Sequence, residues 1–467
     1  MPGTESTARQ PRARSILFSR PALLIAFAFA VMADPVSSVA YAIEAALRAL
    51  DGDLALLLPT MALVVAVVAL VIANYHQLVA RFPQGGGAAA AAGSAFGEGW
   101  AFIPIGALIV DFVLTIAISV SAAASAVIAY LPSVAGWRVP LAVVVVIAVA
   151  GLTWFGHLGR AVFAVMTIAF VVLGVAVITG GLATPPVPTA AGAGPAGGSS
   201  AFVAVLLAFP VAMALATGVE APSSAIAQLG QLDDNGRRRF GRVTLWLTLA
   251  IVGALTLGLT FIAVRLNIGI PQPESTQIAN IAQASVGPRL FALFQLLTAL
   301  LLLAAASSSF QAGPGLLKAL ARRTHVDGAQ TGILHPHMGT SNEHHTPYWA
   351  VVVFLVVSVA VVVAAGAQDQ TLVLFYAVSV FMSFLVGLIA MAKFDFADRR
   401  VWSFLVSVVG AVVIGFTLVV NLLRGYPIVS LLAASGIALV LYLLWVRAGR
   451  PRGIAQAVIE AEVDAPD

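Results

Sequence analysis

The sequence predicts an all-α integral membrane protein of about 12 transmembrane helices, with breaks in the first and sixth. The 467 residues are 60% hydrophobic and only 9% charged, with a mean hydropathy of +1.01. The apolar runs reach the roughly 20 residues that a membrane-spanning helix needs. Two of these runs, at residues 34–41 and 217–224, each contain an acid, a proline and two serines. The composition sets the class, and the two polar interruptions predict the breaks.

The remaining spans follow from the apolar runs taken in order. Residues 1–15 are polar and arginine-bearing, and the first span follows without a small-residue cleavage site, so we expect this span to be retained. The later spans are expected near residues 54–80, 99–130, 138–155, 158–183, 199–229, 243–268, 288–320, 347–366, 369–393, 401–422 and 427–447.

The positions of lysine and arginine orient the bundle, because cytoplasmic loops of membrane proteins are enriched in both. If the N-terminus is inside the cell, few of the 24 Lys and Arg residues lie outside, namely Arg48, Arg138, Arg265, Arg289 and Arg424. We therefore expect a multi-pass protein of the cell (inner or plasma) membrane with both termini in the cytoplasm.

The uncharged loop 184–198 is then external and marks where an inverted repeat of five plus five helices would divide. The predicted transporter domain covers residues 16–450, between a cytoplasmic tail at 1–15 and a short one at 451–467. Within it we expect repeat one at about 16–183, repeat two at about 199–393 and two further helices at about 401–447.

The first break is expected at Asp34 itself, because Pro35 lacks an N–H and disfavours helical angles in the residue before it. The second is expected between Thr217 and Pro222. Unpaired backbone at membrane depth is tolerated only where it is buried in protein or lines a watery cavity. Paired broken helices hold the substrate and ion sites of many secondary transporters, which work by alternating access.

A polar face is predicted on the third span, where Asp111, Thr115 and Ser119 recur every four residues. Each hydroxyl could equally bond to its own backbone or to a neighbouring helix. An intramembrane acid is costly, however, and Asp34, Asp111 and Glu220 have no Lys or Arg at comparable depth. At least one of these acids should be neutral or should have a bound cation.

Two tyrosines, Tyr41 and Tyr376, are placed where they could close over such a site from the outer side, or simply pack as core or interface aromatics. Glu44, one turn beyond Tyr41, is expected near the outer end as a vestibule residue. Buried beside its break, Glu220 is expected to take up and release a proton during transport.

These motifs together resemble the KimA-type potassium/proton symporters, relatives of the Kup transporters within the amino acid/polyamine/organocation (APC) superfamily. The matching segments are Asp34 with residues 37–41, residues 111–119, residues 217–221, and the inner-loop residues 332–334 and 344–349; residues 82–87 also resemble the superfamily's second-span ending. The resemblance implies a LeuT-like fold and a protein that is not an enzyme. It also implies potassium binding by Asp34, Tyr41, Asp111, Thr115, Ser119, Thr217 and Tyr376, with proton coupling through Glu220 and Asp111.

The expected partners are a small cation and the lipid bilayer, with no nucleic acid and no cofactor beyond the transported K⁺ and H⁺. KimA-type proteins continue into a cytoplasmic domain for dimerisation and cyclic-di-AMP control, whereas this sequence ends about twenty residues after its last span. Neither that regulation nor that dimerisation mode is expected to carry over, and monomer and homodimer both stay open.

The alternative function is a proton-coupled amino acid or amine permease of the same superfamily. Permeases of this fold typically use glycines in the first break, where bare backbone N–H groups hold the substrate carboxylate. The break at residues 34–41 has no glycine and contains Asp34, which would repel that carboxylate. Oxygen ligands suit a hard cation, although they do not by themselves separate K⁺ from Na⁺ or an organic amine.

Overall fold

The computed structural model describes residues 20–155, 160–187, 201–321, 325–326, 329–330, 332–344 and 346–454. The predicted tail 1–15, most of the loop 184–198, the end of the tail 451–467 and His345 lie outside these residues. Within them, ten helices are long and apolar enough to cross a membrane. Two more spans complete the predicted twelve: the interrupted first helix and the 17-residue α15.

The first ten spans form two sets of five with the same order of elements. The first set consists of a broken helix, α2 (Arg20–Val31), α3 (Ala33–Ser37) and α4 (Val39–Ala49), then α5 (Leu54–Arg81), the short α6 (Gly87–Phe96), α7 (Phe102–Tyr130), α8 (Arg138–Trp154) and α9 (Arg160–Ala183). The second consists of a broken helix, α10 (Ala201–Ala212), η3 (Met213–Ala216), α11 (Ala221–Ala225) and η4 (Ile226–Gln228), then α12 (Asp234–Arg265), the short α13 (Gln277–Ser285), α14 (Pro288–Ala321), α15 (Tyr348–Ala364) and α16 (Asp369–Ala397).

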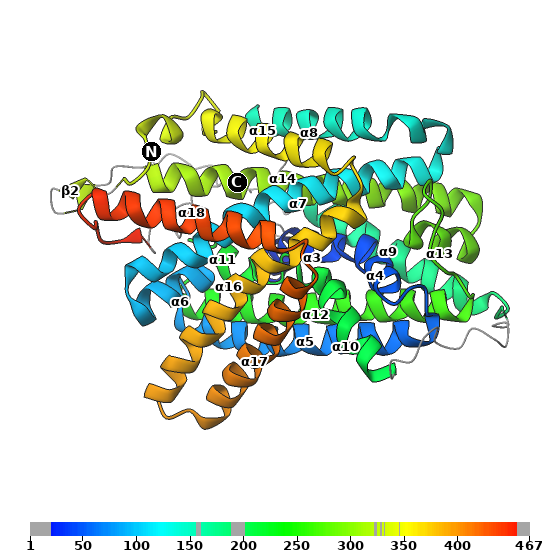
Figure 1. The fold of residues 1–467 in the computed structure, drawn as a ribbon, viewed down its shortest axis with the longest axis horizontal. Helices are drawn as coiled ribbons and strands as arrows, with labels where there is room; N and C mark the ends of the chain where they lie inside the picture. The colour runs from blue at the N-terminus through cyan, green and yellow to red at the C-terminus, as the bar shows by residue number, and fades with distance from the viewer. Residues whose placement is uncertain are drawn as a thin grey trace, which may run out of the picture.

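Corresponding helices of the two sets pack against each other: α5 against α12, α7 against α14, and α8 against α15. The short helices cross over, since α6 packs on α16 and α13 packs on α9. They lie at opposite ends of the bundle (Figure 1), as expected when the second set is inverted relative to the first. The all-α, five-plus-five fold class with broken first and sixth helices is confirmed, although neither short helix was predicted.

The remaining elements are peripheral. Helices α17 (Val401–Leu423) and α18 (Ile428–Arg447) follow the second set and pack on α16 and α7, respectively. Short 3-10 turns precede α7 (η1, Glu98–Ala101), α8 (η2, Pro132–Trp137) and α15 (η5, Pro336–Gly339). A two-residue hairpin pairs β1 (His325–Val326) with β2 (Ala329–Gln330) beyond α14.

Local sequence accounts for several helix boundaries. Asp53, Asp233 and Thr276 each accept a hydrogen bond from the first turn of α5, α12 and α13, respectively, and so satisfy N–H groups that have no partner within the helix. The turn between α5 and α6 runs through Gly85, Gly86 and Gly87, all with positive φ.

The first break is milder than predicted and lies on either side of Asp34. Met32 and Ser38 interrupt the helix, whereas Asp34 is helical within α3. Pro35 is the third residue of α3, where a missing N–H costs little because first-turn N–H groups have no helical acceptor. The prediction of a break at Asp34 itself was therefore wrong by a few residues.

The second break is complete and lies where it was predicted. Thr217 is extended (φ −53°, ψ 131°) and Gly218 has a φ of +69°. The helix resumes at Ala221, with Pro222 in the first turn of α11, a position that proline favours.

Gly106 allows close packing of α7 on α18 and provides a test of the fold. A Cβ there would lie 2.6 Å from the Ala434 carbonyl oxygen and 2.8 Å from the Ala438 nitrogen. We expect Gly106→Val to destabilise the folded protein by about 1–3 kcal/mol, as overpacking typically does, measured by denaturant unfolding of the detergent-purified protein. Gly436→Val is the control, because no atom lies within 4 Å of a Cβ built there. Equal effects of both changes would contradict the packing.

Candidate functional site

The two broken helices meet at the Asp34 carboxylate. A Cβ built on Gly218 would lie 2.6 Å from Asp34 Oδ2 and 2.9 Å from Pro35 Cδ, so only a glycine lets the second break approach this closely. Ser38 Oγ adds a direct link by donating to the carbonyls of Pro35 (2.7 Å) and Leu215 (3.2 Å). The unwound backbone at Gly218 therefore places one half of the protein against the acid of the other.

The predicted polar face of α7 is buried in the bundle. Asp111, Thr115 and Ser119 are 8%, 2% and 1% exposed, respectively. Three oxygen atoms, Asp34 Oδ1, Asp111 Oδ1 and Thr115 Oγ1, have no hydrogen-bond partner in the part of the chain that the structure describes. Buried polar atoms are normally hydrogen-bonded, so these oxygens are candidates for contact with a ligand.

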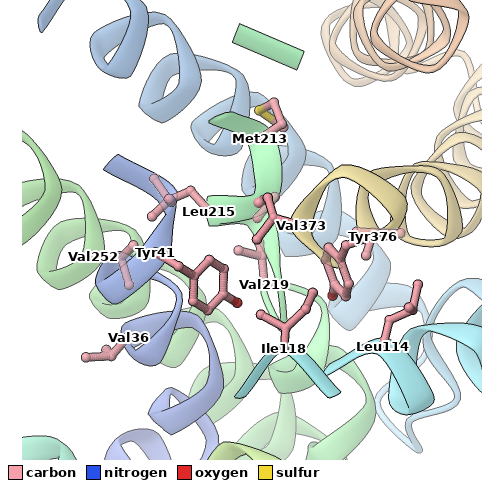
Figure 2. Packing of buried hydrophobic residues seen from close by; sticks show 14 of the residues in the cluster. Val36, Tyr41, Leu114, Ile118, Met213, Leu215, Val219, Val252, Val373 and Tyr376 are labelled. Carbon is pink, nitrogen blue, oxygen red and sulfur yellow. The ribbon is translucent and has the colours of Figure 1, made fainter. Parts of the chain in front are cut away.

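Two tyrosines from opposite halves point into the same region. Tyr41 on α4 and Tyr376 on α16 direct their hydroxyls towards the space beside Ile118 and Val219 (Figure 2). The Tyr41 hydroxyl donates to Thr217 Oγ1 at 3.5 Å, and Thr217 donates in turn to the Ala214 carbonyl at 2.6 Å.

The buried Tyr376 hydroxyl lies beside the Asp111 carboxylate and interacts with it, although their geometry falls outside that of a well-formed hydrogen bond. It lies within electrostatic range of Asp34, Asp111 and Tyr41.

The structure thus brings together five sequence-predicted residues from five segments: Asp34 in α3, Tyr41 in α4, Asp111 in α7, Thr217 in the second break and Tyr376 in α16. Thr115 and Ser119 continue the same face along α7, one and two turns beyond Asp111. Their role in binding stays a prediction.

Glu220, at the end of the second break, has a different environment. Its Oε2 accepts hydrogen bonds from the Tyr75 hydroxyl on α5 and from Ser383 Oγ on α16, both at 3.0 Å. Sequence reasoning missed these two donors. Ser383 could have been found, because it lies two helical turns after Tyr376 and therefore on the same face of the span. Tyr75 carries no such signal, since it lies among Asn74, His76 and Gln77 near the end of its span, where nothing singles out a tyrosine as a partner of Glu220.

The three acids lie within electrostatic range of one another. In the described ranges, the ion pairs join Arg48 to Glu44, Arg81 to Asp398 and Arg237 to Asp234, so none involves Asp34, Asp111 or Glu220. A cluster of buried and half-buried carboxylates without a basic partner can be stabilised by protons or by a bound cation.

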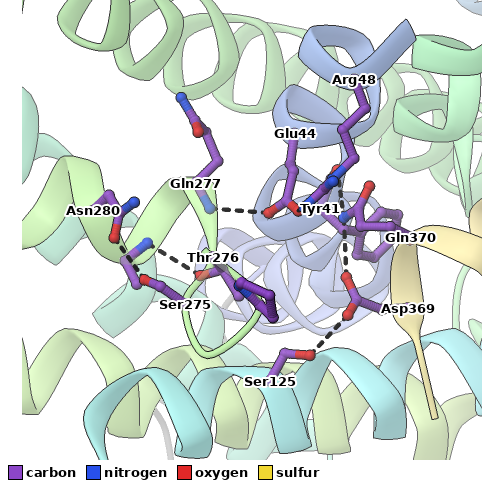
Figure 3. Close-up of polar contacts among 12 residues, drawn as sticks. Tyr41, Glu44, Arg48, Ser125, Ser275, Thr276, Gln277, Asn280, Asp369 and Gln370 are labelled. Carbon is purple, nitrogen blue, oxygen red and sulfur yellow. Dashed lines mark hydrogen bonds and ion pairs between the residues drawn. The ribbon is translucent and has the colours of Figure 1, made fainter. Parts of the chain in front are cut away.

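A second polar network closes the bundle next to the site (Figure 3). Arg138 on α8 donates to Ser125 Oγ on α7, which donates to Asp369 Oδ1 at the start of α16. Gln370 then links Asp369 Oδ2 to the Tyr41 carbonyl. The network joins α8, α7, α16 and α4.

Glu44 lies in the same region. The prediction that it lines an outer vestibule was wrong. Glu44 is 4% exposed, pairs with Arg48 and accepts the backbone N–H of Gln277 in the first turn of α13. The reason is α13, which the sequence analysis did not anticipate and which covers Glu44 with the positive end of a helix.

A helical bundle whose two interrupted helices bring acids and hydroxyls together at its centre defines the class of secondary transporters. The family model described as amino acid permease matches residues 24–453. The chain belongs to this family of permeases, which confirms the superfamily predicted from the motifs.

Among curated proteins, the chain is 29% identical over 325 residues to the potassium transporter KimA of Bacillus subtilis (strain 168). The match covers 67% of this chain and 51% of KimA, so the chain spans about half the length of that relative. This similarity confirms the resemblance to KimA-type proteins. Three crystal structures of variants of the Eremococcus coleocola manganese transporter are 14% identical, with a TM-score of 0.44 over 95% of this chain and 97% of theirs.

The contact between Gly218 and Asp34 makes a direct prediction. We expect Gly218→Ala to destabilise the protein by about 1–3 kcal/mol, because alanine is strained at a φ of +69° and its methyl group would overlap Asp34. Denaturant unfolding of the purified protein measures the change. The matched control is Gly230→Ala, where φ is not positive and no atom lies within 4 Å. A Gly218→Ala protein as stable as the control would contradict the close approach.

Proposed function

We propose that this protein imports potassium by alternating access, coupled to protons. The observation that carries the proposal is the group of unpartnered oxygens on Asp34, Asp111 and Thr115, buried near the point where the two broken helices meet. Oxygen atoms of carboxylates, hydroxyls and freed carbonyls replace the hydration shell of a hard cation. The two carboxylates supply charge that offsets the cost of removing water from the ion.

Within this proposal, Asp34, Asp111, Thr115, Ser119 and Thr217 hold the ion, and Tyr41 and Tyr376 cover it. The hydroxyl of Tyr41 already contacts Thr217, so the two can move as a unit when the site opens. The similarity to KimA, named as a potassium transporter, favours potassium over other cations.

Glu220 suits a proton-coupling role. It shares the electrostatic environment of Asp34 and Asp111 but accepts hydrogen bonds from two hydroxyls, Tyr75 and Ser383. Those hydroxyls belong to α5 and α16, so relative movement of these helices changes how well the charged carboxylate is stabilised. Such a change links proton uptake to the transport cycle, with Asp111 as a second proton carrier.

The driving forces are compatible with this coupling. A membrane potential contributes about 2.3 kcal/mol per charge per 100 mV, and a tenfold concentration gradient costs about 1.4 kcal/mol. An uncoupled monovalent cation could therefore accumulate roughly fortyfold. Uptake from more dilute media requires the proton gradient as well.

The second candidate is a proton-coupled amino acid or amine permease, which the description of the matching family favours. One observation argues against an amino acid substrate. The half-buried Asp34 lies next to Gly218 in the second break. Its charge would repel a substrate carboxylate there.

We propose that the protein lies in the cell membrane with both termini in the cytoplasm. We also propose that the loop 184–198 separates the two repeats. The positions of arginine and lysine support this orientation.

Uptake into proteoliposomes tests the substrate. We expect the wild type to take up potassium or rubidium and none of a panel of amino acids. Asp34→Asn and Asp111→Asn should each abolish uptake, because each removes charge that offsets ion dehydration. Ser119→Ala should weaken ion binding by only about 0.5–1.5 kcal/mol, the contribution of one hydrogen-bonding group.

The control is Asp51→Asn, which removes the same charge from an exposed turn after α4 and should leave uptake unchanged. The potassium proposal would be overturned in favour of the permease by one pattern of results. The wild type would take up amino acids but no potassium, and Asp34→Asn would keep or improve the amino acid uptake.

The role of Glu220 is tested separately with Glu220→Gln. The amide keeps the shape of the side chain but cannot exchange a proton, so we expect cation binding to persist while uptake loses its dependence on external pH. Glu274→Gln, an exposed acid between α12 and α13, is the matched control and should keep that dependence. An unchanged pH dependence in Glu220→Gln would remove Glu220 from the proton path.

A further inference from the structure

A cavity of about 710 Å³ lies at one end of the bundle, between the end of α5, the start of α12 and the end of α16. Its size is within the range of small-molecule sites. Five arginines line it, Arg81, Arg238, Arg239, Arg242 and Arg400, against a single carboxylate, Asp395. The cavity is separate from the group of acids at the centre of the bundle.

The positive charge of this cavity is only partly neutralised. Arg81 forms an ion pair with Asp398 at 2.6 Å. Asp395 is almost fully buried and accepts from Ser407 Oγ, which itself accepts from Asn74. In the described part of the chain, no carboxylate forms an ion pair with Arg238, Arg239, Arg242 or Arg400.

The contacts of the α12 arginines are weak. Arg242 Nε donates to the His76 carbonyl at 3.3 Å, and Arg238 Nη1 reaches Asn235 Oδ1 at 3.5 Å. Arg238 Nε is buried and has no hydrogen-bond partner among the described residues. Most guanidinium donors around the cavity are thus available to a ligand.

We infer that this cavity binds a phosphate-bearing anion with two or more negative charges. All the cationic groups are arginines, whose planar guanidinium matches phosphate oxygens in bidentate pairs. The arginines come from three separate parts of the fold, so one ligand contacts α5, α12 and the α16–α17 junction together.

The location allows two sources of the phosphate. The arginines lie at the ends of membrane-spanning helices, where lipid headgroups meet the protein, and basic pockets between such helices bind polyanionic lipids. The same cavity also accommodates a soluble phosphate compound. The shared chemistry is a cluster of phosphate oxygens with at least two negative charges.

Bound at this position, the anion restrains the helices that hold Glu220. Tyr75 is six residues before Arg81 on α5, about 9 Å along the helix at 1.5 Å per residue. Ser383 precedes Met391, another lining residue, by about two turns on α16. A bound anion therefore acts on the helices that position Tyr75 and Ser383, the two donors to Glu220. The anion site itself does not depend on which substrate the protein transports.

Direct binding to the full-length purified protein tests the inference without any transport assay. The soluble probes are pyrophosphate and, as a polycarboxylate comparison, citrate, both measured by isothermal titration. The lipid probe is cardiolipin, measured by its retention on protein extracted from phosphatidylcholine vesicles with and without cardiolipin. Retained cardiolipin identifies a lipid source, and pyrophosphate binding identifies a soluble one.

The test variant replaces Arg238, Arg242 and Arg400 by Gln, and we expect it to lose affinity about tenfold or more, because several charge-assisted hydrogen bonds disappear. The matched control replaces three exposed arginines that do not line the cavity, Arg399, Arg447 and Arg452, by Gln. It should change affinity by less than about twofold, because exposed charges contribute little. Asn235→Glu, a single change at an exposed lining residue, should also weaken binding and keeps the test valid if the triple variant does not fold.

Three results would overturn the inference: no binding of either phosphate probe to the wild type, equal losses in the test and control variants, or citrate binding as tightly as pyrophosphate.

Discussion

The centre of this protein depends on the close approach of the Asp34 carboxylate to the backbone of Gly218. Two chain segments from different halves can approach this closely only because one has no side chain and runs at a φ of +69°. The contact places a carboxylate beside unwound backbone in the middle of an apolar bundle. Asp111 and Tyr376 complete the surroundings of this contact between the two broken helices.

The acids of the core have two kinds of environment. Asp34 and Asp111 each keep an oxygen without a hydrogen-bond donor, whereas Glu220 is held by the hydroxyls of Tyr75 and Ser383. Unpartnered buried oxygens favour a bound cation, and a carboxylate held by movable donors favours exchange of a proton. Ion binding and proton coupling are therefore assigned to different acids, although the acids remain within electrostatic range of each other.

The two ends of the bundle are also built differently. At one end, Arg138, Ser125, Asp369 and Gln370 form a continuous network in which charges and hydroxyls have partners within the protein. At the other end, arginines surround a cavity and largely lack carboxylate partners. A network of paired charges and hydroxyls holds helices together without a ligand, whereas a cluster of like charges requires an anion to do the same.

The sequence alone determined the membrane class, the number of spans, the two breaks and most of the acids and hydroxyls at the centre. These features depend on local properties: hydropathy over a span length, the missing N–H of proline, and the four-residue spacing of Asp111, Thr115 and Ser119. The short helices α6 and α13 were missed because ten and nine residues are too few for the hydropathy signal of a span. Only the tertiary structure decided that Glu44 is buried under α13, that Tyr75 donates to Glu220, and that Gly218 lies against Asp34. Each of these contacts joins residues more than a hundred positions apart, and their distance is set by helix packing, which no local pattern records.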